Sequence, residues 1–304
     1  MKVVPNIEMD SLTETVEPAV VTGAIIEPPV CFSLPVTDHG VDQDLAGDLA
    51  VAEAIQKSLL PKEFPTLPGF GLAAFCQSAR HIGGDFYDVV RTGPSSALLV
   101  VADVMGKGVS AALFAASLRI LLRSFAEVYA RPSELLEHIN RRMFEELSSV
   151  DMFITAQVAL IDTERRLVEV ASAGHCPLLL ASATKGVQAI APNGLPFGID
   201  PYTHYVERTE VLGPDACALL YTDGVTEACD QVGSAFGHER LMAWLARNSG
   251  INQSAALLKK QFLADFRSFR MDTPLRDDLT LLFLAEEGQS ERPNGKQNTW
   301  TVQE

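Results

Sequence analysis

Short apolar segments follow one another along this chain without an intervening helix, and that succession limits the fold more than any other feature. Their length and their alternating or continuous apolar character are typical of β-strands. The segments span residues 70–77, 85–92, 96–103, 152–162, 165–174, 176–183, 217–224 and 278–285. Strands that are neighbours in sequence pair most readily as antiparallel partners through short turns. The sequence therefore predicts mainly antiparallel sheets.

Longer segments with helical periodicity separate these groups of strands. They span residues 44–60, 108–130, 131–149, 236–248 and 252–269. In the first segment the apolar residues recur three or four positions apart and Pro61 ends the helix. Its apolar stripe consists of Leu45, Leu49, Ala52, Ile55 and Leu59. Runs of strands interrupted by blocks of helices predict an α+β fold with helices outside the sheets. A doubly wound sheet, the second choice, would alternate strand and helix more strictly.

The domain organisation follows from where this periodicity begins and ends. A single domain is expected over residues 44–285, with residues 44–60 as a linker helix at its start. Residues 1–43 and 286–304 are polar and irregular, and both are predicted to be disordered. Residues 1–50 carry nine Asp or Glu and one Lys. This acidic leader is either a solvated segment or a tail that docks on a partner.

Composition excludes several classes of protein. The formal net charge of −15 disfavours nucleic acid as a partner, because the phosphate backbone would repel such a surface. No apolar run is long enough to predict a membrane span, and the N-terminus lacks the pattern of a secretion signal. The five cysteines, at positions 31, 76, 176, 217 and 229, form no C-x-x-C pair. Free thiols in a reducing cytoplasm are the expectation.

Aspartates recur at the ends of the predicted strands. They are Asp85 and Asp88 after two glycines, Asp103, Asp223, and the pair Asp277 and Asp278. One such aspartate is usually a turn former or a helix cap. Several brought together would repel one another unless they bound protons or a cation. Oxygen ligands suit Mg²⁺ or Mn²⁺, and without a Cys/His cluster zinc is not expected. The sequence thus predicts a divalent-cation site at these strand ends.

Other chemistries find less support in the sequence. No cysteine is followed by Arg six residues later, as a cysteine phosphatase requires, and neither a Walker loop nor a G-x-S-x-G elbow occurs. His175 could be a general acid or a hydrogen-bonded structural histidine. Lys107 opens a predicted helix, where the helix dipole disfavours a cation, and it could face a substrate phosphate or solvent.

Over residues 46–285 the sequence resembles the SpoIIE/RsbU-type branch of the metal-dependent serine/threonine protein phosphatases, a type-2C-like family. The resemblance rests on motifs in the family's order: AIQKSLLP, GGDFYD, ADVMGKGVSAALFAA, MFITA, ASAGHCPLLL, GLPFGI, LLYTDGVTEA, FGHERL and RDDLTLLFLA. It implies an α/β/β/α sandwich of two mainly antiparallel sheets, with two Mn²⁺ or Mg²⁺ ions in a cleft at one edge.

The resemblance also implies which residues hold the ions. Asp103 would bridge both ions, and the backbone carbonyl of Val104 would bind the second. Asp223 and Asp277 would complete the ligands of the first, and Asp85 would act on the second, directly or through water. Supporting roles would fall to Asp88, Gly84 and Asp278.

The implied activity is hydrolysis of phosphoserine or phosphothreonine, in which water activated by the ions attacks phosphorus without a covalent phosphoenzyme. The implied substrate is an anti-anti-sigma factor with a STAS-type fold, whose dephosphorylation frees a sigma factor through partner switching. Two alternatives stay open: a partner-switching binding module without activity, and a hydrolase of small phosphoesters. Control is expected through a separate regulator or through a homodimer joined by the helix at 44–60, unless that helix packs on its own domain.

Overall fold

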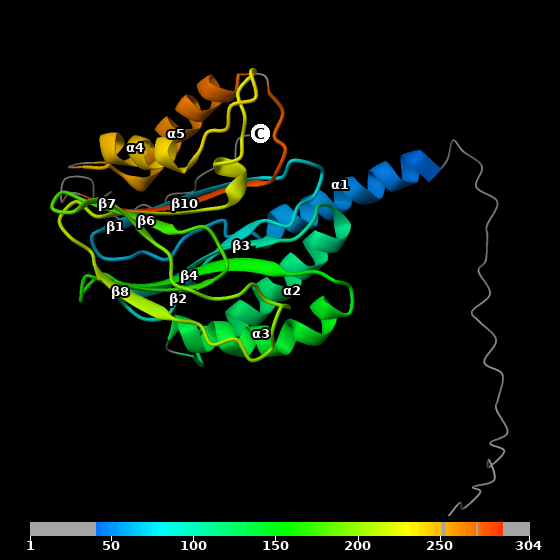
Figure 1. The fold of residues 1–304 in the computed structure, drawn as a ribbon, viewed down its shortest axis with the longest axis horizontal. Coiled ribbons are helices and arrows are strands. Elements are labelled where there is room, and N and C mark those ends of the chain that lie inside the picture. The colour runs from blue at the N-terminus through cyan, green and yellow to red at the C-terminus, as the bar shows by residue number, and fades with distance from the viewer. Residues whose placement is uncertain (1–40, 130, 251–252, 272, 288–304) are drawn as a thin grey trace, which may run out of the picture. The chain divides into compact units, whose positions relative to one another are not determined.

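The computed structural model describes residues 41–129, 131–250, 253–271 and 273–287 (Figure 1). From Gln43 onward the described residues form one compact unit. The disorder predicted for residues 1–43 and 286–304 falls mostly on residues 1–40 and 288–304, which lie outside the described residues, but residues 41–43 belong to the first helix and Glu286 to the last strand. Within the described part of the chain, no helix combines the length and the apolar character needed to cross a membrane.

Two five-stranded sheets face each other, and every pair of neighbouring strands in them is antiparallel. The first sheet contains, in spatial order, β1 (Phe70–Gln77), β10 (Leu279–Glu286), β9 (Cys217–Tyr221), β6 (Leu178–Ser182) and β7 (Gly186–Ile190). The second contains β2 (Phe86–Arg91), β3 (Ser96–Val104), β4 (Ile154–Asp162), β5 (Leu167–Ala173) and β8 (Glu207–Val211). The predicted antiparallel strands are therefore confirmed.

Helices cover the outer faces of both sheets (Figure 1). The covering helices are α2 (Val109–Phe125), α3 (Pro132–Ser148), α4 (His238–Asn248) and α5 (Ala255–Arg270). Helix α1 (Val41–Leu59) precedes the first strand, and a 3₁₀ turn, η1 (Asp223–Val225), follows β9. Side chains of α2 and α3 pack against the second sheet, and those of α4 and α5 pack against the first. The α+β fold class and the α/β/β/α sandwich are thus confirmed.

Alternation along each strand divides the core into three apolar layers. On β3, Leu98, Val100 and Ala102 face the helices α2 and α3, whereas Leu99 and Val101 face the other sheet. The third layer lies between the first sheet and the helices α4 and α5. Because successive side chains of a strand point to opposite faces, an aspartate at a strand end faces either the helices or the other sheet, depending on its position. Only the aspartates that face the other sheet can meet between the sheets.

Two strands and the 3₁₀ turn were not expected from the sequence. Strands β7 and β8 lie at the edges of their sheets, and most of their side chains are at least partly exposed. An edge strand needs few apolar residues, so its periodicity is weak. The prediction also ran the helix at 108–130 too far, because α2 ends at Phe125.

Candidate active site

The ends of four strands bring the predicted aspartates to one edge of the sandwich. Asp103 is the penultimate residue of β3, and Asp223 starts η1 just after β9. Asp85 directly precedes β2, and Phe86 pairs with Ala102, so that the β2–β3 register carries Asp85 toward Asp103. Asp277 lies just before β10. Segments far apart in sequence therefore meet here because of strand pairing.

Asp103 lies among like charges. Burial first, and then the charges of Asp223, Asp277 and Asp278, together raise the pKa of its carboxyl from 3.8 to about 7, while an interaction with Asp85 acts in the opposite direction. Repulsion and desolvation both disfavour a second negative charge in such a place. The ionised form of Asp103 is therefore unfavourable unless a cation lies nearby.

Asp85 is the most enclosed member of the group. Its pKa is raised well above 3.8, first by burial and then by the charge of Asp103. One of its oxygens accepts a 2.7 Å hydrogen bond from the hydroxyl of Thr222, the residue next to Asp223. Burial and the neighbouring negative charge both favour the protonated form of Asp85.

Asp223 completes the group from the other sheet. Burial raises its pKa, as do the charges of Glu227 and Asp277, whereas the backbone N–H of Gly224 and the charge of Lys107 lower it. Hereafter Asp85, Asp103, Asp223 and Asp277 are called the acidic cluster.

The Asp278 carboxylate accepts hydrogen bonds from the backbone. Its two carboxylate oxygens accept 2.8 Å hydrogen bonds from the N–H groups of Ala79 and Gly84. A side chain at Gly83 would collide with this carboxylate, and one at Gly224 would collide with the Asp278 carbonyl. Glycine is required at both positions because the backbone passes so close. Asp278 therefore holds the segment that delivers Asp85.

The backbone at Gly84 also comes close to the carbonyl oxygen of Val104. A Cβ atom at Gly84 would lie only 2.6 Å from this oxygen. The backbone next to Asp85 thus comes as near to Val104 as a glycine allows. The predicted carbonyl ligand and the predicted Asp85 ligand consequently lie beside each other.

Asp88 lies outside the acidic cluster, although it is only three residues from Asp85. It falls on the helix-facing side of β2, fully buried. There it pairs with Arg123 at 2.6 and 2.7 Å and with Arg119 at 3.1 Å, both on α2. The structure gives Asp88 the role of tying β2 to α2 in place of the supporting role at the ions.

Both ring nitrogens of His175 are hydrogen-bonded. Nδ1 lies 2.7 Å from the Thr155 hydroxyl, and Nε2 lies 3.1 Å from the Tyr221 carbonyl. Because a carbonyl only accepts, Nε2 carries the proton and Nδ1 accepts from Thr155. Burial lowers the pKa of His175 to about 4. A neutral, doubly bonded ring braces the ends of β4 and β9, which favours the structural interpretation over the general acid.

Lys107 does not simply reach into solvent, and its facing a substrate phosphate stays a prediction. Its ammonium lies 2.8 Å from a carboxylate oxygen of Asp277 and also donates to the Arg276 carbonyl. It therefore reaches back into the acidic cluster and engages one of the predicted ligands.

The acidic cluster offers the donor set that a hard divalent cation requires, but the side chains are turned to other partners. Among the described residues, no three His, Cys, Asp or Glu side chains are arranged as a ready metal shell. One oxygen of Asp85 accepts a hydrogen bond from Thr222, and Asp277 pairs with Lys107 at 2.8 Å. Oxygen donors with pKa values raised by burial and mutual repulsion fit Mg²⁺ or Mn²⁺. Binding would require Asp277 to exchange Lys107 for the metal ion.

Comparison with known proteins agrees with this geometry. The family model of stage II sporulation protein E (SpoIIE) matches residues 93–285, more than half of the chain. The chain belongs to the SpoIIE family. The predicted SpoIIE/RsbU-type assignment is thus confirmed.

Relatives of this SpoIIE-family chain include the phosphoserine phosphatase RsbU of Bacillus subtilis (strain 168). It is 26% identical over 86% of this chain and 77% of its own length. The SiaA-PP2C domain of Pseudomonas aeruginosa has a similar structure, with a TM-score of 0.72 and 24% identity over 81% of this chain and 98% of that one. RsbX in complex with magnesium gives a TM-score of 0.56 at 18% identity over 73% and 98% of the two chains.

These comparisons confirm the predicted enzyme class, a protein serine phosphatase, through the family and the relatives named for that activity. The metal-ligand assignments stay predictions. Sequence reasoning missed Thr222 and Thr155, the hydroxyl partners of Asp85 and His175. For Thr222 a signal existed, because it continues the inward-facing alternation of Ala218 and Leu220 on β9.

Proposed function

We propose that this SpoIIE-family chain is a metal-dependent serine/threonine phosphatase that acts on a phosphorylated anti-anti-sigma factor of the STAS type in a partner-switching pathway. The observation that carries the proposal is the acidic cluster, in which burial and mutual repulsion raise the pKa values of Asp85, Asp103 and Asp223 at one edge of the sandwich. Burying carboxylates together is costly, and a bound divalent cation offsets that cost.

Two Mg²⁺ or Mn²⁺ ions would be held by Asp103, the Val104 carbonyl, Asp223, Asp277 and Asp85. When bound, such ions supply a water of lowered pKa and neutralise charge on phosphoryl oxygens. The protein's own part is to hold the donors: Thr222 orients Asp85 by its 2.7 Å hydrogen bond, and Asp278 fixes the backbone beside Gly84.

Among the described residues, no thiol near the acidic cluster is poised as a nucleophile. Cys176 and Cys76 are the nearest thiols, and the pKa of each is raised to about 12, chiefly by burial. A thiol with so high a pKa stays protonated at neutral pH and is a poor nucleophile. Direct attack by water on phosphorus is the reaction that this arrangement supports.

Phosphate release from a phosphorylated STAS protein tests the proposal. Activity should require Mn²⁺ or Mg²⁺, disappear with EDTA, and return with excess metal. Asp223→Asn should abolish it, whereas Asp48→Asn, a matched change at an exposed position of α1, should not. Hydrolysis of p-nitrophenyl phosphate without any release from phosphoproteins would instead favour a hydrolase of small phosphoesters. Full activity of Asp223→Asn would contradict the metal assignment.

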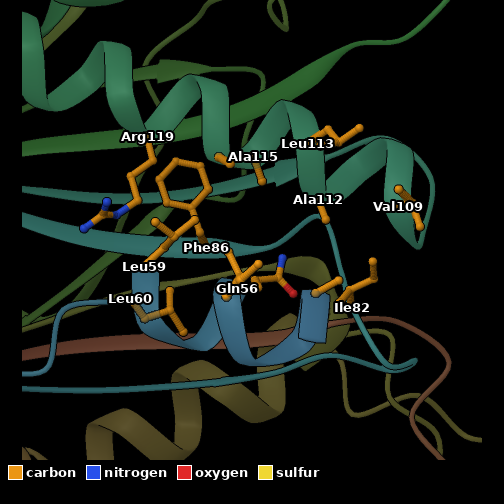
Figure 2. Close-up of a pocket in the computed structure, with 13 residues that line it drawn as sticks. Gln56, Leu59, Leu60, Ile82, Phe86, Val109, Ala112, Leu113, Ala115 and Arg119 are labelled. Carbon is orange, nitrogen blue, oxygen red and sulfur yellow. The ribbon is translucent and has the colours of Figure 1, made fainter. Parts of the chain in front are cut away.

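The chain is further proposed to form a homodimer through α1. None of the described α1 side chains, residues 44–59, is buried, and Leu45, Val51 and Ile55 are more than half exposed. The second half of the predicted stripe turns toward its own domain instead: Ala52, the half-exposed Ile55 and Leu59 line an apolar groove of about 190 Å³, together with Leu113 of α2 (Figure 2). The first half of the stripe is thus left for a second copy to cover, because uncovered apolar area favours association.

A further inference from the structure

A lysine lies inside the acidic cluster. The Lys107 ammonium is 2.8 Å from Oδ2 of Asp277, and its charge also lowers the pKa of Asp223. Its side chain is only one-quarter exposed. The positive charge is therefore paired directly with Asp277, one of the two carboxylates proposed to hold the first ion.

The local backbone offers no other reason for a cation at this position. Lys107 precedes the N-terminus of α2, where the helix dipole disfavours positive charge, and the first turn of α2 holds no acidic residue. Gly106 and Gly108 flank it with φ angles of +89° and +88°, a left-handed conformation that favours glycine. The turn so formed directs the lysine away from its own helix and toward Asp277, 170 positions later in the sequence.

We propose that Lys107 is a tethered counter-ion of the metal site. In the metal-free protein it occupies the Asp277 carboxylate, and a divalent cation binds only by displacing it. Lys107 would therefore set the affinity of the site for its metal and reduce repulsion among the aspartates while the metal is absent. This inference rests on the proposed function, because it requires a metal at the acidic cluster.

The alternative is that Lys107 only anchors the turn through its hydrogen bond to the Arg276 carbonyl. Three variants separate the possibilities. Lys107→Gln removes the charge and keeps a hydrogen-bond donor, Lys107→Met removes both, and Lys107→Arg keeps the charge. Lys185→Met is a matched control, since Lys185 pairs with Glu210 at 3.4 Å on an exposed surface.

The experiment measures Mn²⁺ binding to the full chain by the loss of the free-ion signal in electron paramagnetic resonance. Lys107→Gln and Lys107→Met should bind Mn²⁺ about tenfold more tightly than the wild type, a change of about 1.4 kcal/mol. Lys107→Arg should stay close to the wild type, and Lys185→Met should be unchanged. Circular dichroism checks that each variant is folded.

Thermal unfolding supplies a second readout, the metal dependence of the stability difference. A lysine that only anchored the turn would not produce this dependence. In EDTA, Lys107→Gln should melt below the wild type, because Asp277 has lost its cation. In excess Mn²⁺ the difference should vanish or reverse, since the metal then supplies the charge. Loss of stability of equal size in both conditions would overturn the proposal.

Unchanged or weaker Mn²⁺ binding by both neutral variants would also overturn it, while leaving the proposed phosphatase in place. If the wild type itself bound no Mn²⁺ or Mg²⁺, the metal site would be refuted, and the role of Lys107 with it. The two failures are therefore distinguishable in one series of titrations.

Discussion

Asp103→Asn should stabilise the metal-free protein at pH 8 while it abolishes phosphatase activity. Asparagine keeps the shape of the side chain and removes a charge that is opposed by burial and by three other aspartates. The variant thus separates what the residue costs the apo fold from what it contributes to metal binding.

The size of the effect follows from the pKa of Asp103, which is raised from 3.8 to about 7. Between these pH values the folded protein holds a proton that the unfolded chain has lost, so stability falls as the pH rises through the window. At about 1.36 kcal/mol for each pKa unit, the full cost above pH 7 is on the order of 4 kcal/mol. Because Asp103 is partly exposed, we expect a gain of roughly 1–3 kcal/mol in the free energy of unfolding.

Thermal unfolding in EDTA, followed by circular dichroism, tests this expectation. For a domain of this size such a gain raises the Tm by roughly 3–9 °C at pH 8. At pH 5 the folded wild type already holds the proton, so less than about half of the gain should remain. Asp48→Asn serves as the control. Stabilisation of equal size at both pH values, or destabilisation at pH 8, would refute the argument.

Three further expectations concern other parts of the molecule. Asp88→Asn leaves two guanidinium groups without their buried partner and should lower the free energy of unfolding by about 2 kcal/mol in urea titrations; an unchanged midpoint would contradict this. Replacing all five cysteines with Ser or Ala should preserve Mn²⁺-dependent activity, and inactivation by iodoacetamide with the fold intact would count against it. In sedimentation velocity the wild type should be a dimer at micromolar concentration and Leu45→Glu/Val51→Glu a monomer, with Val232→Glu as the exposed control; a monomeric wild type would exclude the α1 interface.

The sequence alone was enough for most of the strand and helix pattern, because hydrophobic periodicity is a local property, but it missed the partly exposed edge strands β7 and β8. The same alternation also sorts the aspartates. On β2, Tyr87 and Val89 face the other sheet, so Asp85 shares their side and Asp88 takes the opposite one. Even the absence of a Cys/His cluster, which points to oxygen ligands, can be read from the residues alone.

Only the tertiary structure decided which groups each of these side chains contacts. The hydrogen bonds of Asp278 to Gly84 and the pairing of Lys107 with Asp277 join residues on opposite sides of the sandwich. No local pattern encodes such contacts, because strand register and the path of the loops bring the groups together. The pKa values of the acidic cluster depend on the same arrangement, since burial and neighbouring charge are properties of the folded chain.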